Sequence, residues 1–409
     1  MLNKPAVALF ATIIVVSAAC GGNGATTAPT NPPVATGTPA SVTTPPPAST
    51  VASQTAGCSV GVSWNNFQQP RWAAHDKPGI QNTVTTGGGT YIDKDANLSS
   101  EQQATDIQTM VNQGVNVLIV LAQDTTAALP AIKAAEQAGV KVIAYDRLIE
   151  DPTILYITFD NVAVGKDEAA AVLTKVPKGN YVLIKGDPGD PNASTFLPQG
   201  WKEAGLMDKV ASGDITIQNA TGTNYPADYG TFTTAWKTET AQSNMETIID
   251  STTSSGKKID AILAENDSTA LGVVGAETSK SMAYVPLSGQ DGDTANLNNV
   301  ALGKQYVDIW KNANELGKAA GAAALSLCAG GSMASLTLKS GLVDPSVAPV
   351  AGLTAQPFTT PGNNTVSSFI LQPTPLTADN LQLALDGNWV TKDALCAGVQ
   401  AATAPAACK

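Results

Sequence analysis

The sequence is poor in the residues that bind metals and nucleic acids. Its 409 residues include one histidine and five scattered cysteines, so no group of imidazole and thiolate ligands has the spacing of a zinc site. Acidic residues outnumber basic ones by 34 to 23, and no cluster of lysine and arginine interrupts this excess. An acidic chain without a basic patch is a poor match for nucleic acid or an anionic membrane surface. We therefore expect no metal, no cofactor and no nucleic acid, and a small or neutral partner instead.

The first 20 residues have the pattern of an export signal. Lys4 precedes an apolar run from Ala6 to Val16, and three small residues, 17–19, come directly before Cys20. A lipoprotein signal peptidase requires small residues next to a cysteine, which becomes the lipidated N-terminus. We therefore expect a lipoprotein signal peptide over 1–20 and a membrane anchor at Cys20. An ordinary signal peptide cleaved nearby is the alternative, and both place the protein outside the cytoplasm.

Residues 21–57 predict a disordered tether. They are rich in Gly, Ala, Thr and Pro and contain no charged and no aromatic residue. Such a segment cannot bury enough apolar surface to order itself. We therefore expect the folded body to begin at residue 58.

The body alternates between short apolar runs and amphipathic helices. A Ser-Ser pair at 99–100 begins a helix, and further helices are expected over 126–137, 163–173 and 241–250. Buried strands are expected at 60–63, 115–122, 140–145, 181–184, 261–264 and 285–288. This alternation predicts an α/β fold with doubly wound parallel sheets covered by helices.

Polar residues follow these expected strands at the edge where open α/β sheets bind ligands. They include Asp146-Arg147, Asn192, Asn266 and Asp291. A mixture of carboxylates, amides and guanidinium groups suits a ligand covered in hydroxyls. Each residue could alone be a helix cap or half of a surface ion pair. Their repetition at one edge favours a binding site.

These residues belong to motifs that resemble the periplasmic D-xylose-binding proteins of ABC sugar importers. The motifs, which occur in the family's order, are Ala144-Tyr145-Asp146-Arg147, Phe159-Asp160-Asn161, Gly179-Asn180-Tyr181, Asn266-Asp267 and Ser288-Gly289-Gln290-Asp291. The likeness runs from about Val60 to Leu395. It implies a type I periplasmic binding protein: two lobes joined by a three-segment hinge.

The resemblance also implies nine sugar-binding residues: Arg71, Trp72, Asp146, Arg147, Asn192, Trp236, Asn266, Asp291 and Lys311. The match is poor over 219–234, so Tyr225 or Tyr229 could replace Trp236 as the stacking ring. Two further departures are Asn65-Asn66, where the family has acids, and Pro78-Gly79, which we expect to interrupt and shorten the first helix.

The family pattern divides the body into lobe 1, residues 58–157 with 309–352, and lobe 2, residues 162–305 with 366–409. The expected hinge crossings lie near 158–161, 306–310 and 355–365. Cys58 and Cys328 would both lie at the base of lobe 1, which suggests one disulfide and leaves Cys396 to pair with Cys408. Free buried thiols or other pairings are the alternatives.

The resemblance implies a monomeric binding component that delivers D-xylose to a membrane permease. Glucose or arabinose could be the sugar instead, and a chemoreceptor could be a second partner. A secreted glycoside hydrolase is the rival function, because two carboxyl groups near a sugar can cleave it. His75 is expected to be a surface residue and not a ligand.

Overall fold

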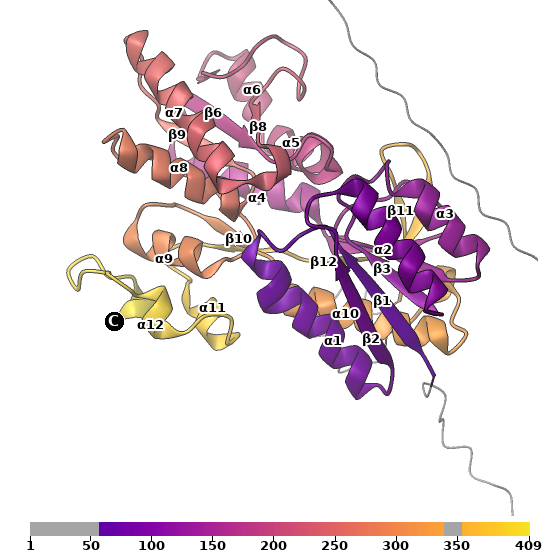
Figure 1. The fold of residues 1–409 in the computed structure, drawn as a ribbon. Coiled ribbons are helices and arrows are strands. Elements are labelled where there is room, and N and C mark those ends of the chain that lie inside the picture. Colours follow the sequence, from indigo (N-terminus) through magenta and orange to yellow (C-terminus); the bar gives the residue numbers. More distant parts are fainter. Residues whose placement is uncertain (1–56, 339–353) are drawn as a thin grey trace, which may run out of the picture. The chain divides into compact units, whose positions relative to one another are not determined.

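The computed structural model describes residues 57–338 and 354–409 (Figure 1). The expected signal peptide with Cys20, nearly all of the tether and residues 339–352 of lobe 1 lie outside this part of the chain. Within the described ranges, no helix is both long enough and apolar enough to cross a bilayer.

The first lobe is built on a seven-stranded sheet with the order β11-β12-β5-β4-β3-β1-β2. All neighbouring strands are parallel except β11 and β12. The strands are β1 (Ser59–Trp64), β2 (Thr90–Asp95), β3 (Val117–Val120), β4 (Lys141–Tyr145), β5 (Leu155–Phe159), β11 (Gln356–Thr359) and β12 (Thr365–Leu371).

Helices cover both faces of this sheet. Side chains of α1 (Lys77–Thr86) and α10 (Ala313–Cys328) share one buried cluster with the sheet, and those of α2 (Ser100–Asn112) and α3 (Leu129–Gln137) share the other. Alternating strand residues such as Val117 and Leu118 enter opposite clusters, as the two-residue period of a strand requires. The lobe is therefore doubly wound.

The second lobe has its own parallel sheet centred on β6 (Gly179–Lys185). This strand pairs with β7 (Ile215–Ile217), β8 (Thr231–Phe232) and β9 (Ala261–Ala264). One face packs on α4 (Asn161–Lys175), α5 (Leu197–Glu203) and α6 (Leu206–Ala211), and the other on α7 (Thr238–Ser254) and α8 (Asp267–Ser279). The expected strand 285–288 is reduced to a single bridge between Ile262 and Leu287.

A smaller unit completes the second lobe. The strands β10 (Asp308–Trp310) and β13 (Thr374–Leu376) pair antiparallel, and α9 (Thr294–Leu302), α11 (Gln382–Asp386) and α12 (Lys392–Leu395) pack beside them. Ile309 of β10 also bridges Gln290 in parallel, which joins this unit to the main part of the lobe.

Two of the three lobe boundaries differ from those expected. The first crossing, at Asp160 between β5 and α4, lies within the expected 158–161. The second lies at 311–312, because β10 still belongs to the second lobe. The third lies at 372–373, since β12 pairs with β5 in the first lobe, so residues 366–371 do not belong to lobe 2. Which sheet a strand at a hinge joins depends on partners far away in the sequence, which a local pattern of residues does not reveal.

Pro78 does not interrupt the first helix. The π turn Trp72–Asp76 leads directly into α1, and Pro78 occupies one of the first two positions of this helix. Proline is tolerated there because the missing backbone N–H is not required for a hydrogen bond within the α-helix. Gly79 instead lets α1 approach α10, because a Cβ there would lie 2.8 Å from the carbonyl oxygen of Asn314.

The second lobe contains the same arrangement of a π turn followed by an α-helix. A π turn over Asn192–Phe196 leads into α5, which also has proline, Pro198, in its first two positions. Gly200 lies against α4, where a Cβ would be 2.2 Å from the carbonyl oxygen of Val162. The residues that introduce or begin the two turns, Arg71 and Asn192, are both predicted ligands, and π turns are frequent at functional sites.

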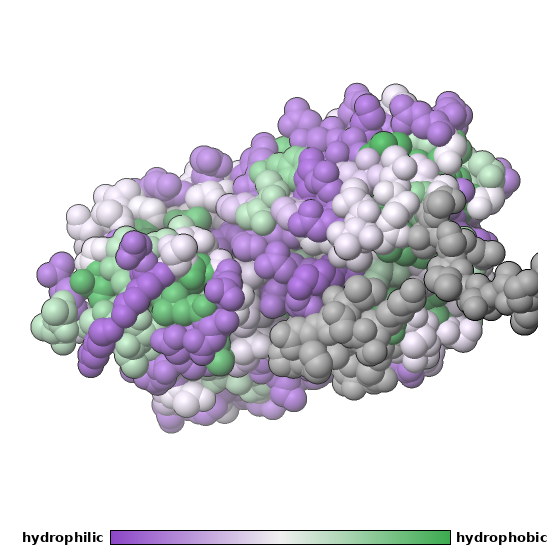
Figure 2. All heavy atoms as spheres, turned by 90° about the horizontal axis from the view of Figure 1, so that it is seen from below, coloured by the Kyte–Doolittle hydropathy of each residue, from purple (hydrophilic) through white to green (hydrophobic). Residues whose placement is uncertain are grey.

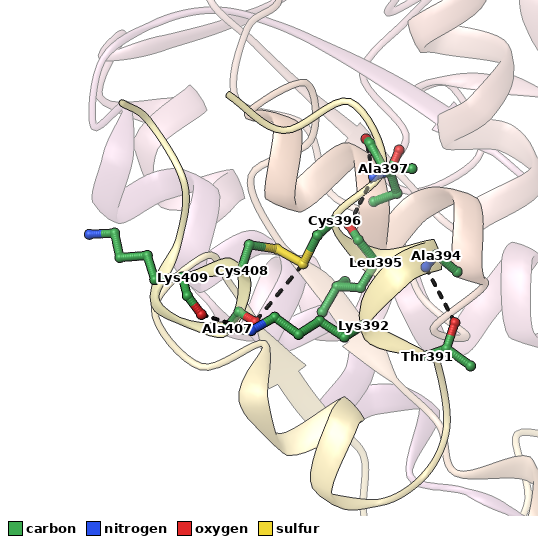
Figure 3. The surroundings of a disulfide bond; sticks show 10 residues. Thr391, Lys392, Ala394, Leu395, Cys396, Ala397, Ala407, Cys408 and Lys409 are labelled. Atoms are coloured by element: carbon green, nitrogen blue, oxygen red, sulfur yellow. Dashed lines mark hydrogen bonds between the residues drawn. A yellow bond between two sulfur atoms is a disulfide. The ribbon is translucent and has the colours of Figure 1, made fainter. Parts of the chain in front are cut away.

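Two disulfides are present. Cys58 before β1 is bonded to Cys328 at the end of α10, and Cys396 is bonded to Cys408 near the C-terminus (Figure 3). Beside the second disulfide, the carbonyl oxygen of Lys409 accepts a hydrogen bond from Lys392 Nζ. The surface seen in Figure 2 mixes hydrophilic and apolar residues, and Tyr284 and Leu383 are the exposed large apolar side chains of the described ranges.

Candidate functional site

A cavity between the two lobes brings together all nine predicted binding residues. It is lined by Gln69, Arg71, Trp72, Asp146, Arg147, Asp190, Asn192, Trp236, Asn266, Gln290, Asp291 and Lys311. The two lobes contribute from the carboxyl ends of their strands: Asp146 follows β4, Asn192 follows β6 and Asn266 follows β9. This is the edge at which open α/β sheets bind ligands.

Arg71 is the centre of a buried ion cluster. Its Nε and Nη2 donate to the two carboxylate oxygens of Asp76, at 3.1 and 2.9 Å. Its Nη1 donates to Asp291 Oδ1 of the other lobe at 3.0 Å and lies 3.4 Å from Asp146 Oδ2. Burial lowers the pKa of Arg71, but the three carboxylates outweigh this effect and raise it well above its ordinary value. The guanidinium therefore stays charged.

Asp146 belongs to this cluster through ion pairs of its Oδ2 with Arg71 and Lys311. Burial raises its pKa, but Lys311 and Arg71 outweigh burial and hold it below the ordinary value. Its Oδ2 is buried without a hydrogen-bond partner among the described residues, and the Nζ of Lys311 is 3.8 Å away. The residue has φ of 64°, an unfavourable conformation that Thr158 supports by donating to its carbonyl oxygen at 2.8 Å. A charged acceptor is thus held ready for a donor.

Arg147 and Asp190 form a second link between the lobes. Arg147 Nε lies 2.8 Å from Asp190 Oδ2, and both side chains are buried. Arg147 Nη1 also donates to the carbonyl oxygen of Ala122 at 2.9 Å. Asn192 follows Asp190 closely, and its Oδ1 accepts from Asn161 at 3.0 Å. The fork of Arg147 is therefore oriented by both lobes.

Trp72 and Trp236 supply aromatic surface from opposite lobes. The guanidinium of Arg71 lies 4.2 Å from the ring centroid of Trp72, whose Nε1 donates to Gln69 at 2.9 Å. Trp236 is 5% exposed, and its Nε1 has no partner among the described residues. Tyr225 and Tyr229 contact each other and do not line the cavity, so Trp236 is the aromatic residue of this region at the site.

Three residues that line the cavity were missing from the sequence-based set: Gln69, Asp190 and Gln290. Gln69 Nε2 donates across the lobes to the carbonyl oxygen of Ala235 at 3.2 Å. Gln290 belongs to the motif Ser288-Gly289-Gln290-Asp291, and its Oε1 is buried without a hydrogen-bond partner in the described structure. Proximity to Arg71, Asn192 and Asp291 in the sequence was the available signal for them.

The simpler interpretation of Asn266 as a helix cap is correct, whereas the pair Asn65-Asn66 and the question of a metal site concern separate residues. Asn266 caps α8 by accepting from the backbone N–H of Thr269 at 2.9 Å, although it also lines the cavity. Asn65 and Asn66 do not line it, and Asn66 Oδ1 accepts from the backbone of Gln68. Within the described ranges, no group of three or more His, Cys, Asp and Glu side chains could hold a metal ion.

A second cavity lies near the first crossing. It is lined mainly by apolar side chains, among them Tyr156, Phe196 and Phe358. It lacks the buried ion cluster of the first cavity, which is therefore the better candidate for a polar ligand.

His75 is not a plain surface residue. Its ring stacks on Trp389 with centroids 3.6 Å apart and 13° between the planes. Burial lowers the pKa of His75 to about 4, so the imidazole is neutral at neutral pH.

Comparison with known proteins identifies the family. Residues 60–332 match the periplasmic binding protein domain. The D-xylose-binding periplasmic protein of Escherichia coli is 32% identical over 72% of this chain and 85% of its own length. A multiple sugar-binding periplasmic receptor of Rhizobium radiobacter is 28% identical over 64% of this chain and 75% of its own.

A solved structure has the same fold. It is an ABC transporter solute-binding protein of Clostridium phytofermentans with bound β-D-glucose, 29% identical, with a TM-score of 0.71 over 82% of this chain and 99% of its own. These relatives are binding proteins and not enzymes. The doubly wound lobes, the cavity between them and the family match over most of the chain lead to one conclusion: the protein belongs to the periplasmic binding protein family.

Proposed function

We propose that this protein is the extracytoplasmic sugar-binding component of an ABC importer and that it binds D-xylose. The observation that carries the proposal is the buried carboxylate oxygen Asp146 Oδ2, which is ion-paired with Arg71 at 3.4 Å and Lys311 at 3.8 Å but has no close hydrogen-bond donor among the described residues, in a cavity that both lobes line. A hydroxyl group can donate to this carboxylate and accept from the neighbouring cations at the same time. A polyhydroxylated ring offers several such groups in one plane.

The residues have complementary roles toward a sugar. Asp146 and Asp291 accept from hydroxyls, while Arg71, Arg147 and Lys311 donate to them. Trp72 and Trp236 provide apolar surface for the C–H faces of the ring. Because the cavity is small and highly buried, these contacts would leave few sugar groups in water.

Binding would be coupled to closure. Arg71–Asp291, Arg147–Asp190 and Gln69–Ala235 already join the two lobes. A sugar that contacts both lobes binds the closed arrangement better than an open one and shifts the population toward it. A permease that recognises the closed form would then receive loaded protein.

D-xylose is the proposed sugar because D-xylose-binding proteins of two species are 32% and 29% identical to this chain. Relatives named for several sugars and for glucose make another aldose, such as glucose or arabinose, the second candidate. Delivery to a chemoreceptor is compatible with import.

Titration calorimetry tests the proposal. The purified protein is titrated with D-xylose, L-arabinose, D-glucose and D-ribose, and we expect D-xylose to bind most tightly, with a micromolar Kd, or about −8 kcal/mol. Asp146→Asn should weaken binding at least about tenfold because it removes the charged acceptor. Asp379→Asn, at an exposed position, is the matched control. If no monosaccharide binds more tightly than millimolar, the proposal is wrong.

We also propose that Cys20 carries the lipid anchor of a monomeric protein, on the strength of the motif that surrounds it. Cys20→Ser should move the protein from the membrane fraction to the soluble fraction and abolish incorporation of a labelled fatty acid. Unchanged incorporation would place the lipid elsewhere.

A further inference from the structure

The C-terminal segment, residues 374–409, has no role in the function proposed above. It is fixed to the second lobe by the pairing of β13 with β10 and by Asn298 Nδ2, which donates to the carbonyl oxygens of Leu395 and Ala397. The Cys396–Cys408 disulfide closes its final loop. Its apolar side chains share a buried cluster with α9 and Trp310. The segment is thus a firmly attached part of the second lobe.

Trp389 of this segment supports the turn that carries Asp291. Its Nε1 donates to the carbonyl oxygen of Gly292 at 2.5 Å, and its ring meets that of Trp310 edge to face at 5.6 Å. Gly292 has φ of 83°, and a Cβ there would lie 2.5 Å from Trp310 and 3.1 Å from Trp389 Nε1. The two indoles therefore enclose the turn next to Asp291, which itself has φ of 110°.

The same indole contacts the first lobe. His75 stacks on it at 3.6 Å, and His75 belongs to the π turn that also contains Asp76, the bidentate partner of Arg71. The stack thus lies beside the Arg71–Asp291 pair, which joins the lobes at the cavity, because His75 belongs to the turn that follows Arg71 and Trp389 is hydrogen-bonded to the residue after Asp291. Separation of the lobes would have to break both contacts.

We propose that Trp389 is a positioning residue for ligand capture and that its stack with His75 is a latch for the closed state. The indole N–H holds the turn of Asp291 in place, and the ring face stabilises closure by contacting the opposite lobe. The expected consequence of the latch, a slower release of sugar, rests on the proposed function. The stack itself consists of protein groups alone.

The decisive variants are at His75, because they change the stack without touching the Asp291 turn. Both variants also remove the hydrogen bond between His75 and Asn314 of the first lobe, so the comparison of phenylalanine with alanine isolates the ring. His75→Ala removes the ring, His75→Phe restores a flat ring, and Gln81→Ala at an exposed position of α1 is the control. Spin labels at the exposed positions Gln108→Cys and Thr247→Cys, one on each lobe, report the distance between the lobes in the full chain carrying Cys20→Ser. D-xylose titration and stopped-flow dissociation report capture.

We expect His75→Ala to shift the sugar-free protein toward longer interlobe distances and to weaken D-xylose binding by about tenfold, mostly through faster dissociation. His75→Phe should recover both. Equal distances and affinities for His75→Ala and Gln81→Ala, or a phenylalanine variant as impaired as the alanine one, would overturn the latch. Should the unmodified protein bind no monosaccharide, the function proposed above fails, while the label distances still decide the latch.

Trp389→Phe separates the second role. It keeps a ring for the stack but lacks the N–H that Gly292 accepts, so sugar affinity should fall while the interlobe distance stays short. Unchanged affinity would show that the hydrogen bond does not position Asp291.

Discussion

At the scale of single residues, the site depends on a missing side chain as well as on charged ones. Gly186 follows β6, and a Cβ at this position would lie 2.1 Å from two atoms of the Trp236 ring. Its φ is not positive, so glycine is needed here for space and not for backbone conformation. The ring of Trp236 can therefore lie directly on the main chain.

We predict that Gly186→Ala displaces Trp236 and weakens sugar binding by roughly tenfold or more, because a contact of 2.1 Å cannot be tolerated. Tryptophan fluorescence should shift, and titration calorimetry should show the loss. Gly189→Ala is the control, since its Cβ would meet only the side-chain oxygens of Asp187 at 3.2 Å and Asp124 at 3.8 Å. Equal affinities for the two variants would contradict the assigned role of the ring.

Sequence reasoning at this scale succeeded where a rule of topology applied. Asp146, Asn192 and Asn266 follow buried strands, and their place at one edge could be foreseen. Asp190 could not be singled out, because its partner Arg147 lies on the other lobe and no local pattern links them. Likewise, nothing near His75 indicates the indole of Trp389 that stacks on it.

At the scale of whole elements, the apolar runs and helix starts were largely predictable. The Ser99 cap of α2 accepts from the backbone of Gln102, as the Ser-Ser pair suggested. The strand expected at 285–288 did not form, because only Leu287 pairs with β9. Pro78 was misjudged because a sequence does not reveal the π turn that precedes it. Apolar content indicates burial, whereas pairing depends on the neighbouring strand.

Helix α8 contains a buried acid that should make stability depend on pH. Glu277 is fully buried, and burial raises its pKa to about 8, although its carboxylate accepts from the backbone N–H of Val285. In the unfolded chain the group titrates near 4.5. The folded state therefore keeps a proton that the unfolded state loses as the pH rises between these values, so stability falls over that range.

We predict that Glu277→Gln removes this loss, because glutamine cannot ionise in either state. Between pH 5 and 7.5 the unmodified protein should lose ~3 kcal/mol more of its unfolding free energy than the variant. Urea unfolding at the two pH values measures the difference, with the exposed Glu239→Gln as control. Parallel changes in all three proteins would mean that Glu277 is ionised in the folded state.

At the scale of the whole molecule, two disulfides of very different span constrain the chain. Cys58–Cys328 joins residues 270 positions apart, and Cys396–Cys408 joins residues 12 apart. The entropy lost by the unfolded chain grows with the enclosed loop, so the first bond should stabilise by about 5 kcal/mol and the second by about 3.

We predict that the pair Cys58→Ser and Cys328→Ser lowers the unfolding free energy more than the pair Cys396→Ser and Cys408→Ser. Denaturant unfolding of both double variants measures this difference. Sugar affinity serves as the check that the lobes still assemble. A larger loss from the short loop would show that local packing of the C-terminal segment outweighs the loop term.

The two-lobe architecture could be predicted, but the later boundaries could not. Strand β12 enters the sheet of the first lobe beside β5, far from it in the sequence, and β10 pairs with β13 across another long interval. Pairings between strands so far apart in the sequence cannot be predicted from the pattern of apolar residues within either strand. The family pattern predicts three crossings, and the strand pairings in the structure determine where the second and the third lie.

The bond between Cys58 and Cys328 also has a mechanical consequence. Strand β1 lies between β2 and β3, and Cys58 is the residue that precedes it. Tension applied at residue 57 would therefore not peel β1 out of its sheet alone, because the sulfur bridge passes part of the load to the end of helix α10. A protein attached through its N-terminal end would therefore resist unfolding at the point where the force is applied.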